Sequence, residues 1–187
     1  MGEWQGEVRR DDALVERVSA FTDDDLASLC EAVSAAIIEG GNFGWAQPPE
    51  RAALEAYFRG LLLVPERSLF LARADGVVVG SAQLLRPSRN NQAQAFSATL
   101  KQLFIAPYAR RRGLARMLAD RVEERARAIG CQVMNLELRE GQGEAVAFFE
   151  SIGYRRWGEH PAYARVNGRT LRGFYYYKPL QPGGVVA

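Results

Sequence analysis

Residues 100–130 join an apolar strand, a proline turn, an arginine-rich glycine loop and an amphipathic helix in one uninterrupted order. The strand expected over 100–105 leads through Pro107 into the loop RRRGLA, which runs directly into a helix expected over 114–129. The first N–H groups of such a helix have no acceptor inside the helix, and its dipole places about half a positive charge there. This order therefore predicts a phosphate site between a strand and a helix.

The loop itself has the residues that such a site needs. Gly113 removes the Cβ that would stand between the backbone and a ligand, and Ala115 keeps the next approach narrow. Arg110, Arg111 and Arg112 supply side-chain donors for phosphate oxygens. The loop contains neither GxxxxGK[ST] nor GxGxxG and instead matches [QR]xxGx[GA]. Two other interpretations stay open, a solvated charge run that begins a helix and a basic patch for nucleic acid.

Composition excludes some classes of protein and sets the expected organisation. A net charge of +2, from 24 basic and 22 acidic residues, argues against a nucleic-acid partner.

The length and hydrophobic content predict the organisation of the chain. At 187 residues and 48% hydrophobic content, we expect one domain over 1–187, with a polar N-terminal tail over about 1–12 and a flexible C-terminal tail over about 181–187. The sequence has no bilayer-length apolar run and no signal-peptide pattern, which predicts a cytoplasmic protein without a membrane partner. Cys30, Cys131 and the single His160 show no metal-ligand spacing, so neither a metal nor a disulfide is expected.

The remaining pattern alternates between strands and helices. Thr22 and Asp25 form a capping box that begins a first helix, and Asp75-Gly76 is a two-residue hairpin turn. Helices are expected over 22–37, 48–61, 114–129 and 144–152, and strands over 14–18, 68–74, 77–85, 100–105, 133–138, 154–158 and 171–178. This order predicts an α/β sandwich, a mixed and mostly antiparallel sheet with helices on both faces.

Three segments carry a resemblance to a known family. FIAPYARRRGLARMLADRVEERARAIG, residues 104–130, and AVAFFESIGYRR, residues 145–156, resemble the cofactor loop and a later helix of the GNAT superfamily of N-acetyltransferases. The ending GEHPAYARVNGRTLRGFYYYKPL, residues 158–180, is similar to that of the tabtoxin-resistance acetyltransferase and its bacterial relatives. The resemblance implies the GNAT-type acyl-CoA N-acyltransferase fold, with acetyl-CoA as co-substrate and no metal.

The resemblance also implies which residues bind the cofactor. The pantetheine arm would lie on Phe104 and Ile105, which also contribute an oxyanion donor, and the pyrophosphate on the arginine loop. Two positions of the cofactor-binding set depart from the family: Gln142 stands where an Asn is common, and Phe149 where a Tyr protonates the leaving sulfur. The implied cofactor-binding set is Phe104, Ile105, Arg110, Arg111, Arg112, Gly113, Leu114, Ala115, Arg116, Gln142 and Phe149.

Glu137 is the residue expected to remove the proton of the substrate amine. Period-two alternation over 133–138 separates it from the apolar face of its strand, and the tabtoxin-resistance relative carries an acid in this role at the matching position. An alkylammonium has a pKa near 10, so a carboxylate lowers the cost of removing its proton near neutral pH. Glu137 binding the ammonium, or lying exposed in an ion pair, stays open. Thr99 stands where the family often has a second acid. Because threonine cannot act as a base, removal of the proton is assigned to Glu137.

Phenylalanine cannot donate a proton, so either water or a tyrosine from elsewhere in the chain substitutes at the leaving sulfur, or the thiol, with a pKa near 8.5, leaves without an acid. Tyr108, Tyr154 and Tyr163 are the candidates, and Tyr163 is favoured as a catalytic residue. A buried aromatic in a C-terminal strand is the alternative for Tyr163.

The acceptor pocket is expected where the two N-terminal helices face the splayed strands. Its border would include GGNFGW, residues 40–45, as a lid or a plain connector, and the loop 86–92. The expected activity is direct transfer of acetyl to a primary amine of a small molecule, an amino-acid-like metabolite, toxin or antibiotic. Alternatives are a protein N-terminal or lysine acetyltransferase, a non-catalytic acyl-CoA-binding module and an RNA-associated protein. The chain is expected to be a monomer or a homodimer, with the aromatic run 174–177 available for pairing across subunits.

Overall fold

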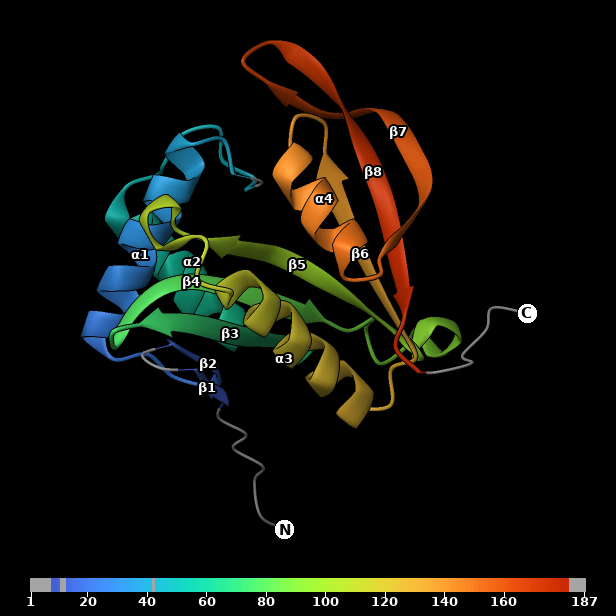
Figure 1. Cartoon of the computed structure of the whole chain (residues 1–187), viewed down its shortest axis with the longest axis horizontal. Helices are drawn as coiled ribbons and strands as arrows, with labels where there is room; N and C mark the ends of the chain where they lie inside the picture. The colour runs from blue at the N-terminus through green and yellow to red at the C-terminus, as the bar shows by residue number, and fades with distance from the viewer. Residues whose placement is uncertain (1–7, 11–12, 42, 182–187) are drawn as a thin grey trace.

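The computed structural model describes residues 8–10, 13–41 and 43–181. Within them, one sheet has the strand order β1-β2-β3-β4-β5-β6-β8-β7 (Figure 1). The strands are β1 Val8–Arg10, β2 Ala13–Val18, β3 Arg67–Ala74, β4 Val77–Leu85, β5 Ser97–Ile105, β6 Val133–Arg139, β7 Arg155–Val166 and β8 Arg169–Pro179. Among these strands only β5 and β6 pair in parallel, so the expected mixed, mostly antiparallel sheet is confirmed.

Helices cover both faces of the sheet, as expected. On one face, α1 (Asp23–Ile38) and α2 (Arg51–Leu62) bury an apolar cluster against β3 and β4. On the other face lie α3 (Leu114–Ala128) and α4 (Gly143–Ser151), whose apolar residues join a second cluster with β2 to β6 and β8 (Figure 1). Burial of these faces supplies most of the driving force for folding, at roughly 25 cal/mol per Å² of apolar surface. None of the helices in the described ranges is long and apolar enough to cross a membrane.

Two local signals of the sequence form as predicted. The Thr22 hydroxyl accepts a hydrogen bond from the Asp25 N–H at 3.1 Å and caps α1, whose first turn is acidic. Asp75 and Gly76, which join β3 to β4, have φ of +53° and +81°, the signature of a type I′ hairpin turn. Helix starts and tight turns are therefore where local chemistry fixes the backbone.

Three expectations about strands were wrong. Residues 8–10 of the expected N-terminal tail pair with β2, while residues 1–7, 11–12 and 182–187 of the two expected tails lie outside the described residues. β7 continues to Val166 instead of ending at Gly158, because Pro161 falls in a bulge of this edge strand, where a proline is tolerated. The run 174–177 belongs to β8, which is paired on both sides by β6 and β7, so its backbone is not free to pair across subunits.

The site is created by an irregularity in β5. Its pairing with β4 slips by one residue between Lys101 and Phe104, and Gln102 there has a φ of +49°. Such a bulge bends a strand. Beyond Thr99 and Asn135, β5 and β6 no longer pair, and the two strands diverge into an opening (Figure 1).

Candidate active site

The opening between β5 and β6 contains a cavity of about 390 Å³. The N-terminus of α3 closes one end of it, and α4 lies along its side (Figure 1). The cavity brings together ten of the eleven residues expected to bind the cofactor, all except Arg112. Its lining comprises Ala36, Gly41, Leu100, Gln102, Leu103, Phe104, Ile105, Ala109, Arg110, Arg111, Gly113, Leu114, Ala115, Arg116, Leu136, Glu137, Leu138, Gln142, Glu144, Ala145, Phe148 and Phe149.

The N-terminus of α3 faces this cavity with its backbone open. Gly113 is the N-cap with a φ of +79°, and no side chain of the described residues caps this end. A Cβ built on Gly113 meets no atom within 4 Å, so the space in front of the helix is free. Arg111 also has a positive φ, +66°, which turns successive N–H groups toward one side. These features fit a diphosphate.

The arginines of the loop divide into two groups. Arg110 donates to Glu39 at 2.8 Å and Arg112 to Asp75 at 3.1 Å, so both are already neutralised by carboxylates. Arg112 does not line the cavity, which argues against it as a phosphate donor. The exposed Arg111 makes no hydrogen bond or ion pair with another described residue. The loop thus has features of both a solvated charge run and an expected anion site, and among the described residues the Arg111 side chain is its one arginine without a carboxylate partner.

Gln142 and Phe149, which depart from the family pattern, lie at the α4 side of the cavity. The Gln142 side-chain oxygen accepts from the Arg139 N–H at 2.9 Å and fixes the turn between β6 and α4. Phe149 is buried, and its ring packs edge-on against Phe148 and Tyr154 at centroid distances of 5.0 and 5.3 Å. Position 149 therefore offers an apolar wall and no proton.

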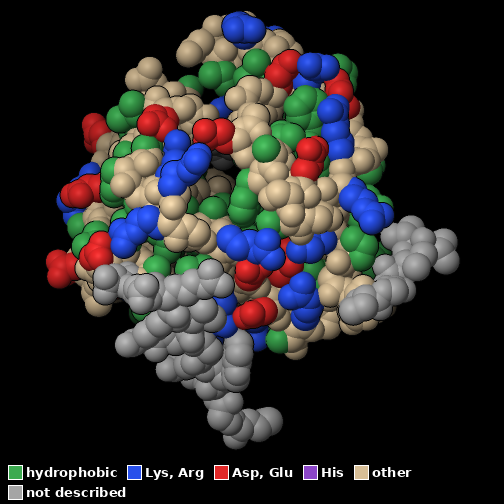
Figure 2. Space-filling view, in the orientation of Figure 1, with side chains coloured by type: hydrophobic (Ala, Val, Ile, Leu, Met, Phe, Trp, Pro, Cys, Tyr) green, Lys and Arg blue, Asp and Glu red, His purple; other side chains and the backbone are tan. Residues whose placement is uncertain are grey.

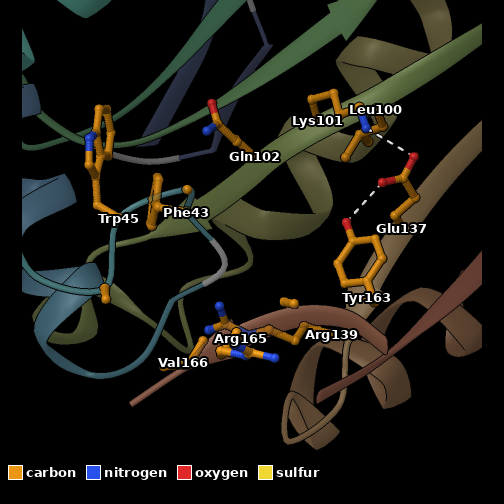
Figure 3. A pocket seen from close by; sticks show the side chains of 13 residues that line it. Phe43, Trp45, Leu100, Lys101, Gln102, Glu137, Arg139, Tyr163, Arg165 and Val166 are labelled. Atoms are coloured by element: carbon orange, nitrogen blue, oxygen red, sulfur yellow. Dashed lines mark hydrogen bonds and ion pairs between the residues drawn. The ribbon is translucent and has the colours of Figure 1, made fainter. Parts of the chain in front are cut away.

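A second cavity, of about 450 Å³, lies on the other side of β5 and β6 (Figure 3). It shares Leu100, Gln102 and Glu137 with the first, so the two cavities meet where the strands separate. In the space-filling view a hollow opens between the two halves of the molecule, with Lys and Arg side chains at its rim (Figure 2). The lining is Phe43, Gly44, Trp45, Ala46, Leu100, Lys101, Gln102, Glu137, Arg139, Tyr163, Ala164, Arg165 and Val166.

Glu137 lies at this junction, held from two sides. One carboxylate oxygen accepts from Lys101 Nζ at 3.1 Å and the other from the Tyr163 hydroxyl at 2.8 Å (Figure 3). Burial, followed by the hydrogen bond to Glu137, raises the pKa of Tyr163 to about 12, so the phenol is protonated at neutral pH. Glu137 thus has the ion pair expected of an exposed glutamate on a strand, and it also lines both cavities. Each oxygen keeps lone-pair capacity for a further donor.

The position of Tyr163 depends on Gly173. The pairing of β7 with β8 is irregular between His160 and Ala164, and Tyr163 reaches across β8 to β6 from this bulge. A Cβ on Gly173 would clash with Tyr163 Cγ, so the ring occupies the space that any other residue would fill. The glycine is required by this close approach.

The loop after α1 forms the opposite wall of the second cavity. The Phe43 ring packs on Phe104 at 5.1 Å and Trp45 on Tyr57 at 4.9 Å, while Arg139 donates to the Gly40 carbonyl at 3.1 Å. This confirms that the segment 40–45 borders the site, although Asn42 lies outside the described residues. No residue of the loop 86–92 lines either cavity, so that expectation was wrong, because the loop lies at the opposite end of β4 from the opening.

Gln102, which sequence reasoning did not single out, is anchored by a partly buried hydrogen-bond network. Its side-chain oxygen accepts from the Tyr57 hydroxyl and from Gln83 Nε2, both at 2.5 Å. Gln83 in turn accepts from Arg67 at 2.5 Å. This network holds the bulge in place where the two cavities meet.

The other candidate groups lie elsewhere. Tyr108 is 66% exposed and lines neither cavity; Tyr154 is buried, and burial raises its pKa far above the ordinary value. Cys30 and Cys131 are free thiols, as expected, and burial raises the pKa of both, of Cys30 to about 11. Among the described residues no group of three His, Cys, Asp or Glu is arranged to hold a metal.

Comparison with known proteins identifies the family of this architecture. The family model for the Acetyltransferase (GNAT) family matches residues 30–154. The chain is 53% identical to the "Uncharacterized N-acetyltransferase in hisH-hisA intergenic region" of Azospirillum brasilense, over 70% of this chain and 78% of that protein. Its fold resembles an N-acetyltransferase from Staphylococcus aureus Mu50, with a TM-score of 0.77, 17% identity and coverage of 91% and 100%. It also resembles a GNAT superfamily phosphinothricin acetyltransferase from Sinorhizobium meliloti, in complex with AcCoA, with a TM-score of 0.73, 22% identity and coverage of 90% and 88%. The chain belongs to the Acetyltransferase (GNAT) family.

Proposed function

We propose that the protein is an acetyl-CoA-dependent N-acetyltransferase that transfers acetyl directly to a primary amine of a small, amino-acid-like molecule. One observation carries the proposal. A cavity built around a free helix N-terminus and a second cavity meet at a single carboxylate, Glu137. Two substrates bound in these cavities would touch at that point, which is the arrangement that direct transfer requires.

The first cavity suits coenzyme A because of its donors. The N–H groups at Gly113, Leu114 and Ala115, with Arg111, would hold the pyrophosphate, and the free edge of β5 at Phe104 and Ile105 the pantetheine arm. Bound there, the cofactor supplies an acetyl group as a thioester. The chain contributes a fixed geometry and main-chain donors at the free edge of β5 for the carbonyl oxygen.

Glu137 and Tyr163 are the proposed catalytic residues in the second cavity. Glu137 would take the proton of the acceptor ammonium, and the Tyr163 hydroxyl would hold Glu137 in place. Because the pKa of Tyr163 is raised to about 12, its hydroxyl keeps the proton that a donor to the leaving sulfur needs. A thiol has a pKa near 8.5 and is a fair leaving group, so the apolar Phe149 is compatible with turnover.

The closer kinship stays a prediction. The Asn167-Gly168 turn between β7 and β8, both at positive φ, fits the polar glycine turn of the tabtoxin-resistance acetyltransferase and its relatives. This turn helps to set the shape of the hairpin over the second cavity, and it does not identify the acceptor.

Binding of coenzyme A tests the first half of the proposal. We expect calorimetry to detect coenzyme A binding, and Gly113→Val to weaken it at least about tenfold, because a Cβ and a strained φ enter the anion site. Gly130→Val is the matched control, since Gly130 has a φ of +87° and open space at the other end of α3. Equal affinities for both variants would contradict the assignment of the phosphate site.

Thiol release from acetyl-CoA with a panel of amino acids and polyamines tests the second half. Turnover with a small amine supports the proposal. Tight coenzyme A binding without turnover on any amine, peptide or protein lysine would instead identify a non-catalytic binding module. Turnover confined to peptides would identify a protein acetyltransferase.

The contact between Gly173 and Tyr163 makes a separate prediction. Gly173→Ala is expected to displace the Tyr163 ring, remove its hydrogen bond to Glu137 and lower kcat/KM for the amine about 10- to 100-fold. Affinity for coenzyme A should hold, because Gly173 does not line the first cavity. Steady-state kinetics and calorimetry give both values.

Two variants separate this effect from general damage to the hairpin. Tyr163→Phe loses the same hydrogen bond without a clash, so its kinetic defect should match that of Gly173→Ala. Gly158→Ala lies on the neighbouring strand β7, where an added Cβ meets the Tyr175 ring only at 3.6 Å, and it should behave like the parent. A full-rate Gly173→Ala variant would show that the ring position does not matter.

A further inference from the structure

The second cavity carries an excess of positive charge. Among its described lining residues, Lys101, Arg139 and Arg165 are cationic, and Glu137 is the single carboxylate. Lys101 is paired with Glu137 at 3.1 Å, which leaves the two arginines uncompensated. The cavity thus concentrates as much positive charge as the whole chain has in excess.

The two arginines have different partners. Arg139 donates to the carbonyls of Gly40 and Gly41, at 3.1 and 3.4 Å, which orients its guanidinium without neutralising it. The Arg165 side chain makes no hydrogen bond or ion pair with any other residue of the described part of the chain. Two carboxylates near this hairpin are engaged elsewhere, since Glu159 of β7 and Glu140, just after β6, both accept from Arg172.

Strand geometry places these arginines next to Glu137, the proposed base. Glu137 and Arg139 are two residues apart on β6, so their side chains lie on the same face, about 7 Å apart along the strand. Tyr163 lies in the bulge of β7 and Arg165 just beyond it, and both line the same cavity. Glu137 with Tyr163, and Arg139 with Arg165, therefore form two neighbouring polar positions along one cavity wall (Figure 3).

We infer that the acceptor carries a carboxylate, bound by Arg139 and Arg165, while its amine faces Glu137. Guanidinium groups match carboxylates in shape and donor geometry, and a buried substrate anion is favoured where the protein supplies uncompensated cations. The phosphates of coenzyme A have their own site in the first cavity, which neither arginine lines. This inference rests on the proposed function and narrows its acceptor to amino acids.

Matched acceptor pairs test the inference. Glycine, β-alanine and 4-aminobutanoate would each be compared with their methyl esters, and glutamate with its dimethyl ester, since these esters keep the amine and lose the anion. We expect the parent protein to have a kcat/KM at least about tenfold higher for the free acid of the best pair. Equal values for acid and ester, or a preference for esters, would overturn the inference.

The variant Arg165→Gln ties the preference to the proposed site. It should raise KM for the acid about tenfold or more, lower kcat little, and affect the ester far less. Arg155→Gln is the matched control, because Arg155 is also exposed on β7 but lines neither cavity. Arg139 is less suitable, since it also holds the loop at Gly40. An Arg165→Gln defect of equal size on acid and ester would contradict the site.

Failure of the proposed function remains distinguishable from failure of this inference. If no amine is acetylated, calorimetry of the same amino acids and esters on the coenzyme A-bound protein replaces the kinetics. Tighter binding of the acids, weakened by Arg165→Gln and retained by Arg155→Gln, would support the carboxylate site alone. Absence of binding by every acid would overturn it.

Discussion

Replacing Glu137 with glutamine is expected to lower kcat/KM for an amine acceptor about 10²- to 10⁴-fold near pH 7. The amide cannot take the ammonium proton, and it leaves the Lys101 ammonium without its carboxylate partner, at 3.1 Å in the parent. As the pH rises toward the amine pKa near 10, the acceptor arrives already neutral. The defect of Glu137→Gln should therefore shrink with increasing pH. Rates from pH 6 to 10 measure this recovery.

Glu140→Gln is the control for the loss of a carboxylate. Glu140 lies three residues further along the chain, accepts hydrogen bonds from Arg172 and lines neither cavity. Its replacement should leave the pH profile of the parent. A Glu137→Gln defect that stays constant over the whole pH range would mean that Glu137 binds the ammonium without acting as a base.

Replacing Glu123 with alanine is expected to cost about 3–5 kcal/mol of unfolding free energy. Glu123 lies on the inner face of α3, is 2% exposed, and accepts from Lys178 Nζ of β8 at 2.7 and 2.8 Å. Its removal leaves the Lys178 ammonium, whose side chain is only 17% exposed, without a counter-charge. Arg127 also donates to Glu123 at 3.0 Å, but this side chain is 41% exposed and can turn to water. Urea unfolding gives the free energy.

The double variant Glu123→Met with Lys178→Met shows whether the buried charge causes the loss. Removing both members of a buried ion pair is often neutral or stabilising, so the double variant should recover most of the stability. If it unfolds as easily as Glu123→Ala, packing rather than the unpaired ammonium explains the cost.

Local chemistry explains what was predictable from the sequence. Thr22 begins α1, Asp75-Gly76 turns the β3–β4 hairpin, and Gly113 starts α3, because each position has a backbone requirement that its own side chain, or the lack of one, meets. Period-two alternation also placed Glu137 on the open face of β6. The cavity at α3 followed from the order of strand, loop and helix.

Long-range register explains what was not predictable. The bulge at Gln102 uses a non-glycine residue at positive φ, which has no pattern in the sequence. Tyr163 reaches Glu137 only because β7 is irregular and Gly173 is bare, and Glu123 meets Lys178 across 55 residues. Arg139 and Arg165 were overlooked because cations on strands are usually solvated. The alternation of Arg139 with Glu137 on β6 was the available signal.

The seam between β5 and β6 has a consequence for the lifetime of the protein in a cell. Within the described sheet, its two parts are joined there by only three residue pairs, from Ser97 with Val133 to Thr99 with Asn135. A ligand in the opening would contact both sides of this seam and, at a hundred times its Kd, add about 2.7 kcal/mol to the stability of the fold. When the acetyl donor is scarce, the seam loses that support and local opening exposes it to proteases. Under the proposed function, the abundance of the enzyme would then follow the supply of its own co-substrate.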